Sequence, residues 1–228
     1  MLLAIDTATR AASLALYDGN GIIGELTWVT HESHTTTLLP EIDRLLALTG
    51  RSFDSLAAFA VSLGPGSFTS LRVGISATKG LAVTRHLPVI GIPTLDCVAF
   101  AQREAGEKIG ATISAGRGRF AIALYTSAPK GVERVSDIFL GKPDELIRWA
   151  RAFGSGIYFC GEVTGELAAL IERSLQNARV ASAGVRLRRA GYLAEMAWTR
   201  FLRGEIDTLE TLAPFYLPTA SVPVPLTQ

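Results

Sequence analysis

Residues able to do chemistry are concentrated in short turns, where glycine, hydroxyl and charged residues follow apolar runs. The turn Gly64–Gly66 ends the apolar run 57–63 and leads into Ser67, which is placed to cap the next helix. A glycine-rich turn at a helix start presents backbone N–H groups that can hold an anion. Its spacing matches neither G-x-x-x-x-G-K-S/T nor G-x-G-x-x-G, so no recognised nucleotide motif is present.

Two further turns combine hydroxyl, glycine and charged residues. The turn 6–10 has one carboxylate and two threonines but no glycine, and the turn 114–119 has two glycines and two arginines but no acid. A site that hydrolyses ATP needs glycine-rich hairpins that hold the phosphates and carboxylates that hold Mg²⁺. We therefore expect no catalytic residue, and a degenerate nucleotide or phosphate cleft formed by Asp6, Thr7, Thr9, Gly64, Gly66, Gly116 and Arg117. In an alternative interpretation, Asp6 and the arginines only cap turns.

Two smaller motifs give weaker signals. His31 and His34 stand three residues apart, but a catalytic zinc needs three protein ligands and the spacing is not H-E-x-x-H. We expect no metal site, and His34 is more simply a residue at a helix start. Ser67 lacks the second glycine of G-x-S-x-G, so capping explains it better than nucleophilic chemistry.

The apolar pattern predicts two α/β lobes with the same order of elements. The first lobe, 1–105, has predicted strands 2–6, 12–18, 22–29, 57–63 and 88–92 and helices 36–48, 67–84 and 94–104. The second, 106–210, has predicted strands 109–115, 119–126, 132–140, 157–160 and 180–183 and helices 143–153, 164–175 and 192–203. Whether the last helix, 190–204, packs back on the first lobe is left open. The segment 211–228 is a proline-rich tail. The predicted order of elements in each lobe is βββαβαβα, which makes a mixed sheet with helices on both faces. This plan resembles the two-lobed actin-like ATPase (ASKHA, ribonuclease H-like) fold.

Composition narrows the class of protein. The 228 residues are 48% hydrophobic and 19% charged with a net charge of +1, which favours a globular chain and gives no argument for nucleic-acid binding by this chain alone. Cys97 and Cys160 lie in apolar runs, as reduced buried thiols do. No signal peptide or apolar run long enough to span a membrane is visible. We expect a cytoplasmic protein.

Two predicted helices carry more apolar and small residues than one covered face needs. The helix 36–48 has leucines on more than one face, and Arg72, Ile75 and Lys79 form a stripe on the helix 67–84. Gly74 and Gly80 inside that helix suggest that another backbone approaches closely. Such a stripe is usually solvated surface, but an excess apolar patch commonly marks an interface.

Several segments together form a specific pattern: Leu3–Thr9, His34 with Leu38–Pro40 and Ile42, GPGSFTSLRVG at 64–74, Thr78–Ala82 and Pro88–Leu95. With these segments the sequence resembles the TsaB (YeaZ) family, bacterial components of the machinery that makes threonylcarbamoyladenosine (t6A) in tRNA. The resemblance covers nearly the whole chain. It departs from the family pattern at Ser70, Ser114 and Pro218, near the cleft and the tail.

The resemblance implies a non-catalytic scaffold with no resident cofactor, while ATP or ADP at the partner interface is left open. Members pair with the related catalytic subunit TsaD, recruit the ATPase TsaE, reach tRNA through the complex, and self-associate when alone. The implied partner-binding residues are His34, Leu38, Leu39, Ile42, Leu45, Leu46, Phe68, Leu71, Arg72, Ile75 and Lys79. The alternatives are an ATPase or phosphotransferase that uses the interlobe cleft and, less favoured, a metallopeptidase.

Overall fold

The computed structural model describes residues 1–30, 34–129 and 131–217, which form two compact units. Of the described residues, the first unit contains Met1–Cys97 and Arg188–Phe215, and the second contains Val98–Leu187 with Tyr216 and Leu217. The predicted division at 105/106 therefore differs from the observed one. The chain leaves the first unit within helix α3 (Thr94–Phe100) and returns to it at Arg188.

The first unit is built on a five-stranded mixed sheet in the order β3-β2-β1-β4-β5. β1 pairs with β2, and β2 with β3, in antiparallel fashion, whereas β1–β4 and β4–β5 are parallel. Its strands are β1 (Leu2–Asp6), β2 (Ala11–Tyr17), β3 (Ile22–Val29), β4 (Ala58–Gly64) and β5 (Val89–Pro93). All five residues of β1 are buried, as expected for a central strand that is covered on both faces.

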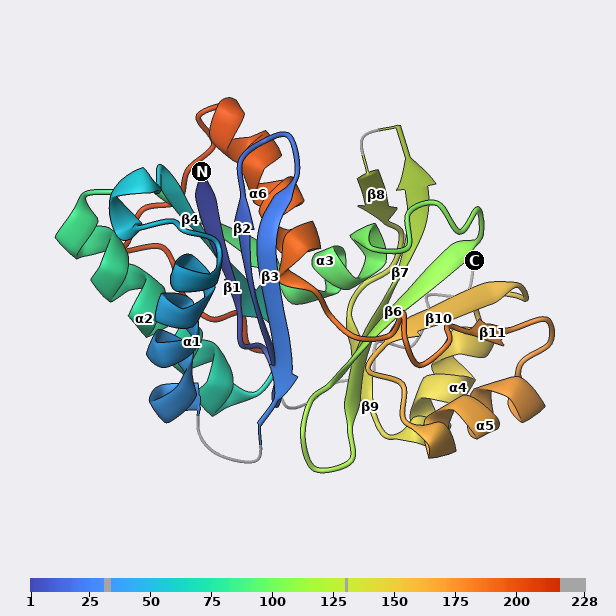
Figure 1. Ribbon diagram of the computed structural model, residues 1–228. Coiled ribbons are helices and arrows are strands. Elements are labelled where there is room, and N and C mark those ends of the chain that lie inside the picture. Colours follow the sequence, from blue (N-terminus) through green and yellow to red (C-terminus); the bar gives the residue numbers. More distant parts are fainter. Residues whose placement is uncertain (31–33, 130, 218–228) are drawn as a thin grey trace. The chain divides into compact units, whose positions relative to one another are not determined.

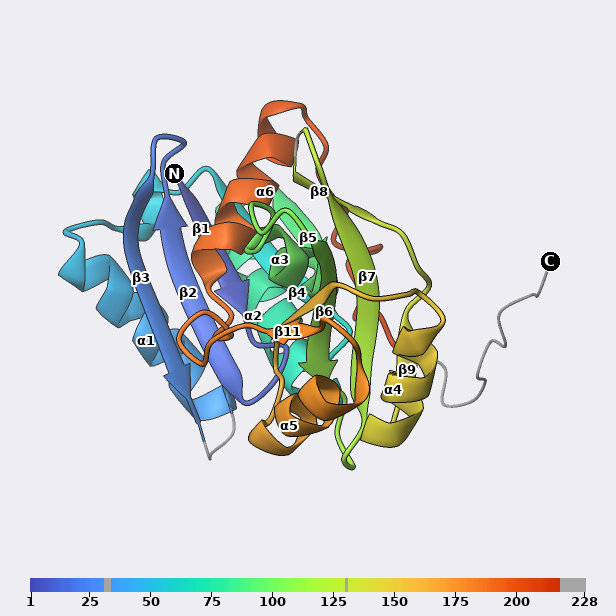
Figure 2. The same cartoon turned by 90° about the vertical axis from the view of Figure 1, so that its right-hand side faces the viewer.

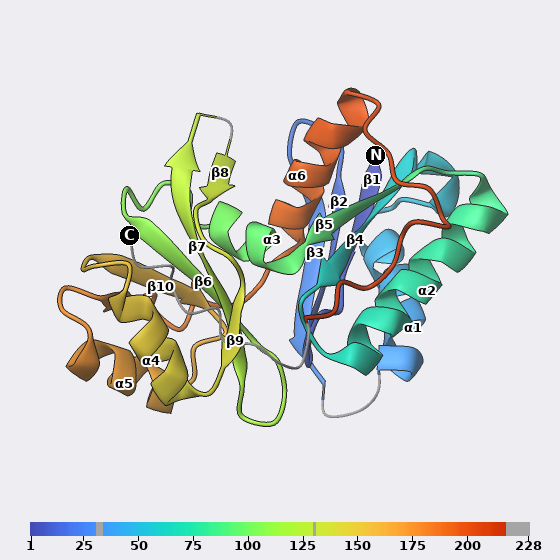
Figure 3. The ribbon, with the colours of Figure 1, turned by 180° about the vertical axis from the view of Figure 1, so that it is seen from behind.

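Helices cover both faces of this sheet. α1 (His34–Leu48) and α2 (Phe68–Arg85) lie side by side on one face, and α6 (Ala190–Leu202) lies on the other (Figures 1 and 3). The core under α1 and α2 contains Leu3, Leu14 and Phe59, and the core under α6 contains Leu2 and Ile90. α6 belongs to the first unit because its apolar face packs on this sheet.

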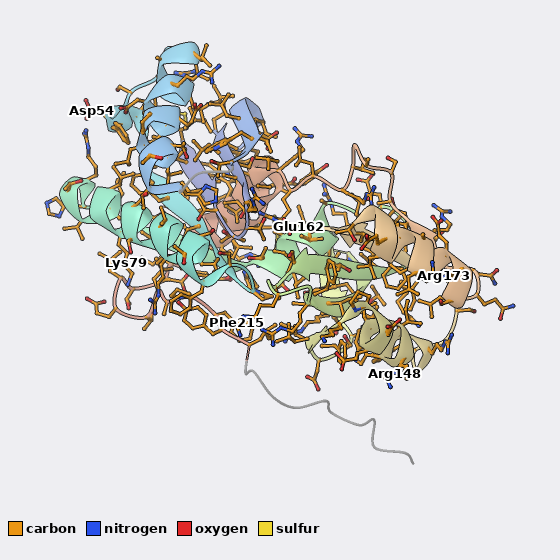
Figure 4. All side chains as sticks on the ribbon, turned by 90° about the horizontal axis from the view of Figure 1, so that it is seen from below. Asp54, Lys79, Arg148, Glu162, Arg173 and Phe215 are labelled. Atoms are coloured by element: carbon orange, nitrogen blue, oxygen red, sulfur yellow. The ribbon has the colours of Figure 1, made fainter. Side chains whose placement is uncertain are left out.

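The second unit contains a six-stranded sheet in the order β11-β10-β6-β7-β8, with β9 paired to β7. Its strands are β6 (Lys108–Ser114), β7 (Phe120–Ala128), β8 (Gly131–Arg134), β9 (Phe139–Gly141), β10 (Ile157–Gly161) and β11 (Arg179–Val180). α4 (Pro143–Arg151) and α5 (Gly165–Ser174) enclose a core with Phe120, Leu124 and Phe159 (Figure 2). Arg148 on α4 and Arg173 on α5 are exposed (Figure 4).

The predicted strand 132–140 is two short strands. β8 pairs with β7 at Tyr125–Ala128, and β9 pairs with the other end of β7 at Phe120–Ile122. Between them the Ser136 hydroxyl accepts the Leu124 N–H at 2.9 Å, so a side chain replaces a backbone partner and the ladder is interrupted. With this one addition, the strand and helix order agrees with the predicted one.

Candidate functional site

The carboxylate of Asp6 lies at the end of β1 and is fully engaged within the first unit. Its Oδ1 accepts the Ala8 N–H at 2.8 Å and the Ser62 hydroxyl at 3.0 Å, and its Oδ2 accepts from Arg188 Nε at 3.0 Å. Asp6 is 1% exposed and Arg188 is 6% exposed. A buried charge is tolerated only when it is paired and hydrogen-bonded, and both conditions are met here.

Arg188 also fixes the turn that follows Asp6. Its two terminal nitrogens donate to Thr9 Oγ1 at 3.0 Å and to the Ala11 carbonyl at 2.8 Å. We refer to Asp6, Thr9, Ser62 and Arg188 as the Asp6 cluster. Sequence reasoning missed Arg188, because 182 residues separate it from Asp6 and no local pattern marks it.

The glycine-rich turn before α2 packs against the chain itself. The Ser67 N–H donates to the Ala8 carbonyl at 2.7 Å, and a Cβ on Gly66 would lie 2.2 Å from that same oxygen. The Thr7 hydroxyl donates to the Ser70 carbonyl at 2.8 Å. The Ser67 N–H is therefore used within the chain, and anion binding by this turn stays a prediction. The predicted role of Ser67 as a helix cap is confirmed.

The two glycines within α2 differ from one another. A Cβ on Gly74 would lie 2.2 Å from Thr7 Oγ1, so this glycine is required for the approach of the 6–10 turn. Nothing in the chain lies within 4 Å of a Cβ on Gly80, so a close approach there by the backbone of another protein stays a prediction. Gly74 thus makes a contact inside the first unit, whereas Gly80 lies on the open surface of α2.

Gly116 and Arg117 belong to the second unit, at the exposed tip of the β6–β7 hairpin. Gly116, Arg117 and Gly118 all have positive φ, at 74°, 53° and 68°, as a tight turn demands. The structure brings Asp6, Thr7, Thr9, Gly64 and Gly66 together within the first unit. Their grouping with Gly116 and Arg117 in one cleft stays a prediction.

A groove of about 440 Å³ lies between α1 and α2, on the helical face of the first unit. These two helices are in contact, and Lys79 is labelled on α2 in Figure 4. We call this the α1–α2 groove; its lining residues are His34, Thr35, Leu38, Leu39, Phe68, Thr69, Arg72, Val73, Ser76 and Ala77. Leu39 and Phe68 are 50% and 53% exposed, so large apolar side chains face solvent here.

The partner-binding residues expected from the resemblance separate into two groups. His34, Leu38, Leu39, Phe68 and Arg72 line the groove, and Lys79 is half-buried on α2 outside it. The others are Ile42, Leu45, Leu46, Leu71 and Ile75, and all of these are buried. Their assignment to a docking surface is corrected, because the chain's own residues already cover them. The leucines of α1 that face solvent are Leu39 and Leu48.

His34 is buried, 3% exposed, yet it lines the groove. Its Nε2 lies 2.6 Å from the Thr9 carbonyl oxygen, which can only accept a hydrogen bond. Its Nδ1 is also buried and has no hydrogen-bond partner among the described residues. Arg72 stacks on the Phe68 ring beside it, with the guanidinium carbon 3.6 Å from the ring centroid.

The remaining expected sites can be located only in part. His31, of the predicted histidine pair, lies outside the described residues. In the described part of the chain, no three His, Cys, Asp or Glu side chains gather as metal ligands would. Among the described helices, none combines the length and hydropathy that crossing a bilayer requires. Cys97 and Cys160 are buried free thiols.

Known proteins resemble this chain in sequence and in structure. The profile of the family described as TsaD, tRNA N6-adenosine threonylcarbamoyltransferase, matches residues 4–218. The tRNA threonylcarbamoyladenosine biosynthesis protein TsaB of Escherichia coli is 35% identical over 133 residues, which cover 58% of this chain and 57% of that protein. Its Haemophilus influenzae counterpart is 43% identical over 118 residues, which cover 50% and 49%. The chain thus spans about half the length of the curated relatives it matches.

The structural match extends further along the chain. YeaZ from Pseudomonas aeruginosa superposes with a TM-score of 0.78 at 27% identity, covering 95% of this chain and 99% of that one. The resemblance to TsaB and YeaZ inferred from the GPGSFT segment and its neighbours is confirmed. The predicted actin-like fold class is confirmed as well.

Proposed function

Since this chain belongs to the TsaD family, we propose that it acts in t6A biosynthesis as a non-catalytic subunit, as the resemblance to TsaB implies. In this proposal it pairs with the catalytic protein TsaD in the cytoplasm, and the pair recruits TsaE. tRNA is reached through the complex, in keeping with a net charge of +1. The chain has no resident cofactor, and it self-associates only when TsaD is absent.

The observation that carries the proposal is the α1–α2 groove. Leu39 and Phe68 expose about half of their surface on neighbouring helices, and the groove continues inward to Leu38 and Val73. Burying such a surface against another protein is favourable, at about 25 cal/mol per Å² of apolar area. Protein interfaces typically combine an apolar centre with aromatic and arginine residues, and Phe68 with Arg72 supplies that pair.

The Asp6 cluster supports the non-catalytic part of the proposal. A carboxylate that holds Mg²⁺ or aligns water needs an oxygen open to the ligand. Both Asp6 oxygens instead accept hydrogen bonds from Ala8, Ser62 and Arg188. The guanidinium of Arg188 already supplies the positive charge that a metal would bring.

A binding experiment with purified TsaD from the same organism tests the proposal. Leu39→Asp and Phe68→Asp place a charge in the groove at exposed positions, so we expect folded variants that lose TsaD binding by more than 100-fold. Leu202→Asp is the matched control, because Leu202 is 69% exposed on α6 at the opposite face of the sheet. Full binding by both groove variants, measured by calorimetry, would contradict the proposal.

A further inference from the structure

One residue that lines the α1–α2 groove carries a buried polar atom whose hydrogen-bonding capacity is unused. His34 is 97% buried by the chain, since its exposed fraction is 3%, and its Nδ1 has no partner among residues 1–30, 34–129 and 131–217. Buried polar atoms without partners are rare in folded proteins because each one costs free energy. The side chain that carries this atom lines the groove. Because Nδ1 itself is covered, a molecule in the groove satisfies it only by displacing the atoms that cover it.

The contact on the other side of the ring determines which kind of group is missing. Nε2 faces the Thr9 carbonyl at 2.6 Å, and because a carbonyl only accepts, Nε2 carries the proton. In the neutral ring, Nδ1 then has a lone pair and no hydrogen. The groove therefore lacks a hydrogen-bond donor rather than an acceptor.

The charge of the residues that line the groove narrows the class of hydrogen-bond donor that fits it. Among the described residues that line it, none is acidic. A lysine or arginine donor would therefore find no described carboxylate in the lining to pair with. The complementary donor is neutral, an O–H or an N–H.

The apolar residues that line the groove indicate the shape and polarity of the group that carries the donor. Leu38, Leu39, Val73 and Ala77 are apolar, and Phe68 offers a ring on which another ring can pack. A small alcohol such as a serine side chain would leave these walls uncovered. Tyrosine and tryptophan combine a large apolar ring with a neutral donor at its edge, and both are enriched at protein interfaces.

We propose that the α1–α2 groove binds an aromatic side chain of the partner protein, a tyrosine or tryptophan, whose O–H or N–H donates to Nδ1 of His34. This inference deepens the proposed function and rests on it. His34 is then a specificity-determining residue: it selects a ring with a donor over a purely hydrocarbon side chain. Thr9 positions it by holding the proton on Nε2.

Small probes test this chemistry without TsaD. p-Cresol and 3-methylindole reproduce the two side chains, and toluene is the control without a donor. NMR of the chain with ¹⁵N-labelled histidine follows Nδ1 directly. We expect p-cresol and 3-methylindole, but not toluene, to shift the Nδ1 resonance of His34. Absence of that shift at saturating p-cresol would overturn the inference.

Two substitutions separate the two ring nitrogens. His34→Gln keeps an amide N–H for the Thr9 carbonyl but has no acceptor at the place of Nδ1, whereas His34→Asn places a carbonyl oxygen near it. We expect His34→Gln to weaken p-cresol relative to toluene by about three- to tenfold, and His34→Asn to preserve the preference. An unchanged ratio of the two dissociation constants in His34→Gln would contradict the inference.

The same variants with TsaD distinguish the inference from the proposed function. We expect His34→Gln to weaken TsaD binding about tenfold and His34→Asn to weaken it less. If TsaD binds wild type and His34→Gln equally, the inference is overturned and the proposed function stands. If TsaD binds neither, the proposed function is wrong, and the p-cresol ratio alone decides what the groove prefers.

Discussion

Two polar regions of the first unit lie on either side of Thr9 and differ in how completely they are satisfied. On one side, Thr9 Oγ1 accepts from Arg188, within a cluster where both oxygens of Asp6 have donors. On the other side, the Thr9 carbonyl accepts from His34, whose second nitrogen has no described partner. One turn thus supports a closed site and an incomplete one.

Under the proposed function, the closed region serves the fold and the incomplete one serves a partner. A fully paired buried charge contributes to a specific native state and leaves nothing for a ligand to bind. In our proposal, a donor of the partner completes the unsatisfied Nδ1 of His34 beside the exposed apolar side chains of the groove. Asp6, the one acidic residue of the 6–10 turn, is therefore engaged in contacts within the chain. The exposed apolar side chains of the groove lie on α1 and α2.

The largest effect is expected where the groove helix meets the core. Ile42 is fully buried on α1, so Ile42→Asp puts an unpaired charge in the core and should prevent stable folding. Leu39, on the same helix but 50% exposed, should tolerate Leu39→Asp within about 0.5 kcal/mol. Urea unfolding of both variants measures this, and equal stability would show that α1 does not divide into a core face and an open face.

The Asp6 cluster gives the next largest effect. Arg188→Met leaves a buried carboxylate without its cation and should lower the free energy of unfolding by about 3–5 kcal/mol. Arg44→Met is the matched control, because its ion pair with Glu41 (Nη1–Oε2 3.2 Å) is exposed, and such pairs contribute about 0–1 kcal/mol. Equal losses in the two variants would remove the distinction between a closed site and ordinary surface.

Much of this architecture could be predicted from sequence, because periodicity reports burial. The runs 2–6 and 57–63 gave central strands, and Ser67 gave the start of α2. The pattern could not say which leucines of α1 face outward, since they lie around more than one face of the helix. It also could not find Arg188, whose role depends on a contact between distant segments.

The second lobe shows the same limit. The apolar stretch 132–140 suggests one strand, but the Ser136 side chain replaces a backbone partner and divides it. The predicted division at 105/106 also differs from the observed one, because the chain leaves the first unit within α3. The return of the last helix to the first lobe, which the sequence left open, is observed. Both differences arise from tertiary contacts that a local pattern does not contain.

The two glycines of α2 offer a comparison of smaller size. Gly74→Ala forces a methyl group to within 2.2 Å of Thr7 Oγ1, so we expect a loss of about 1–3 kcal/mol. Gly80→Ala meets open space and should stabilise α2 by about 1 kcal/mol through helix propensity. Thermal unfolding of both variants measures this, and the same sign for both would mean that the 6–10 turn does not rest on Gly74.

The last effect is absent at neutral pH and appears only at high pH. Burial, and then the nearby Asp6 carboxylate, raises the pKa of Cys97, and burial raises the pKa of Cys160 to about 12. Because the unfolded thiols ionise near pH 9 and the folded ones do not, their contribution to stability is complete below pH 9 and declines above it. We expect a decline of about 1.4 kcal/mol per pH unit and per thiol, absent in the Cys97→Ala/Cys160→Ala variant. Parallel pH profiles for the two proteins would show that the thiols are not buried as described.

The t6A content of tRNA, measured by mass spectrometry in cells that carry each variant as the sole copy of this gene, tests the central distinction most directly. Two variants are compared: Leu39→Asp, which damages the α1–α2 groove, and Asp6→Asn/Arg188→Gln, which removes both charges of the Asp6 cluster and is first shown to be folded by circular dichroism. We predict that t6A falls to the level of a gene deletion in Leu39→Asp and stays near wild type in the double variant. Normal t6A in Leu39→Asp, with loss of t6A in the folded double variant, would contradict the account.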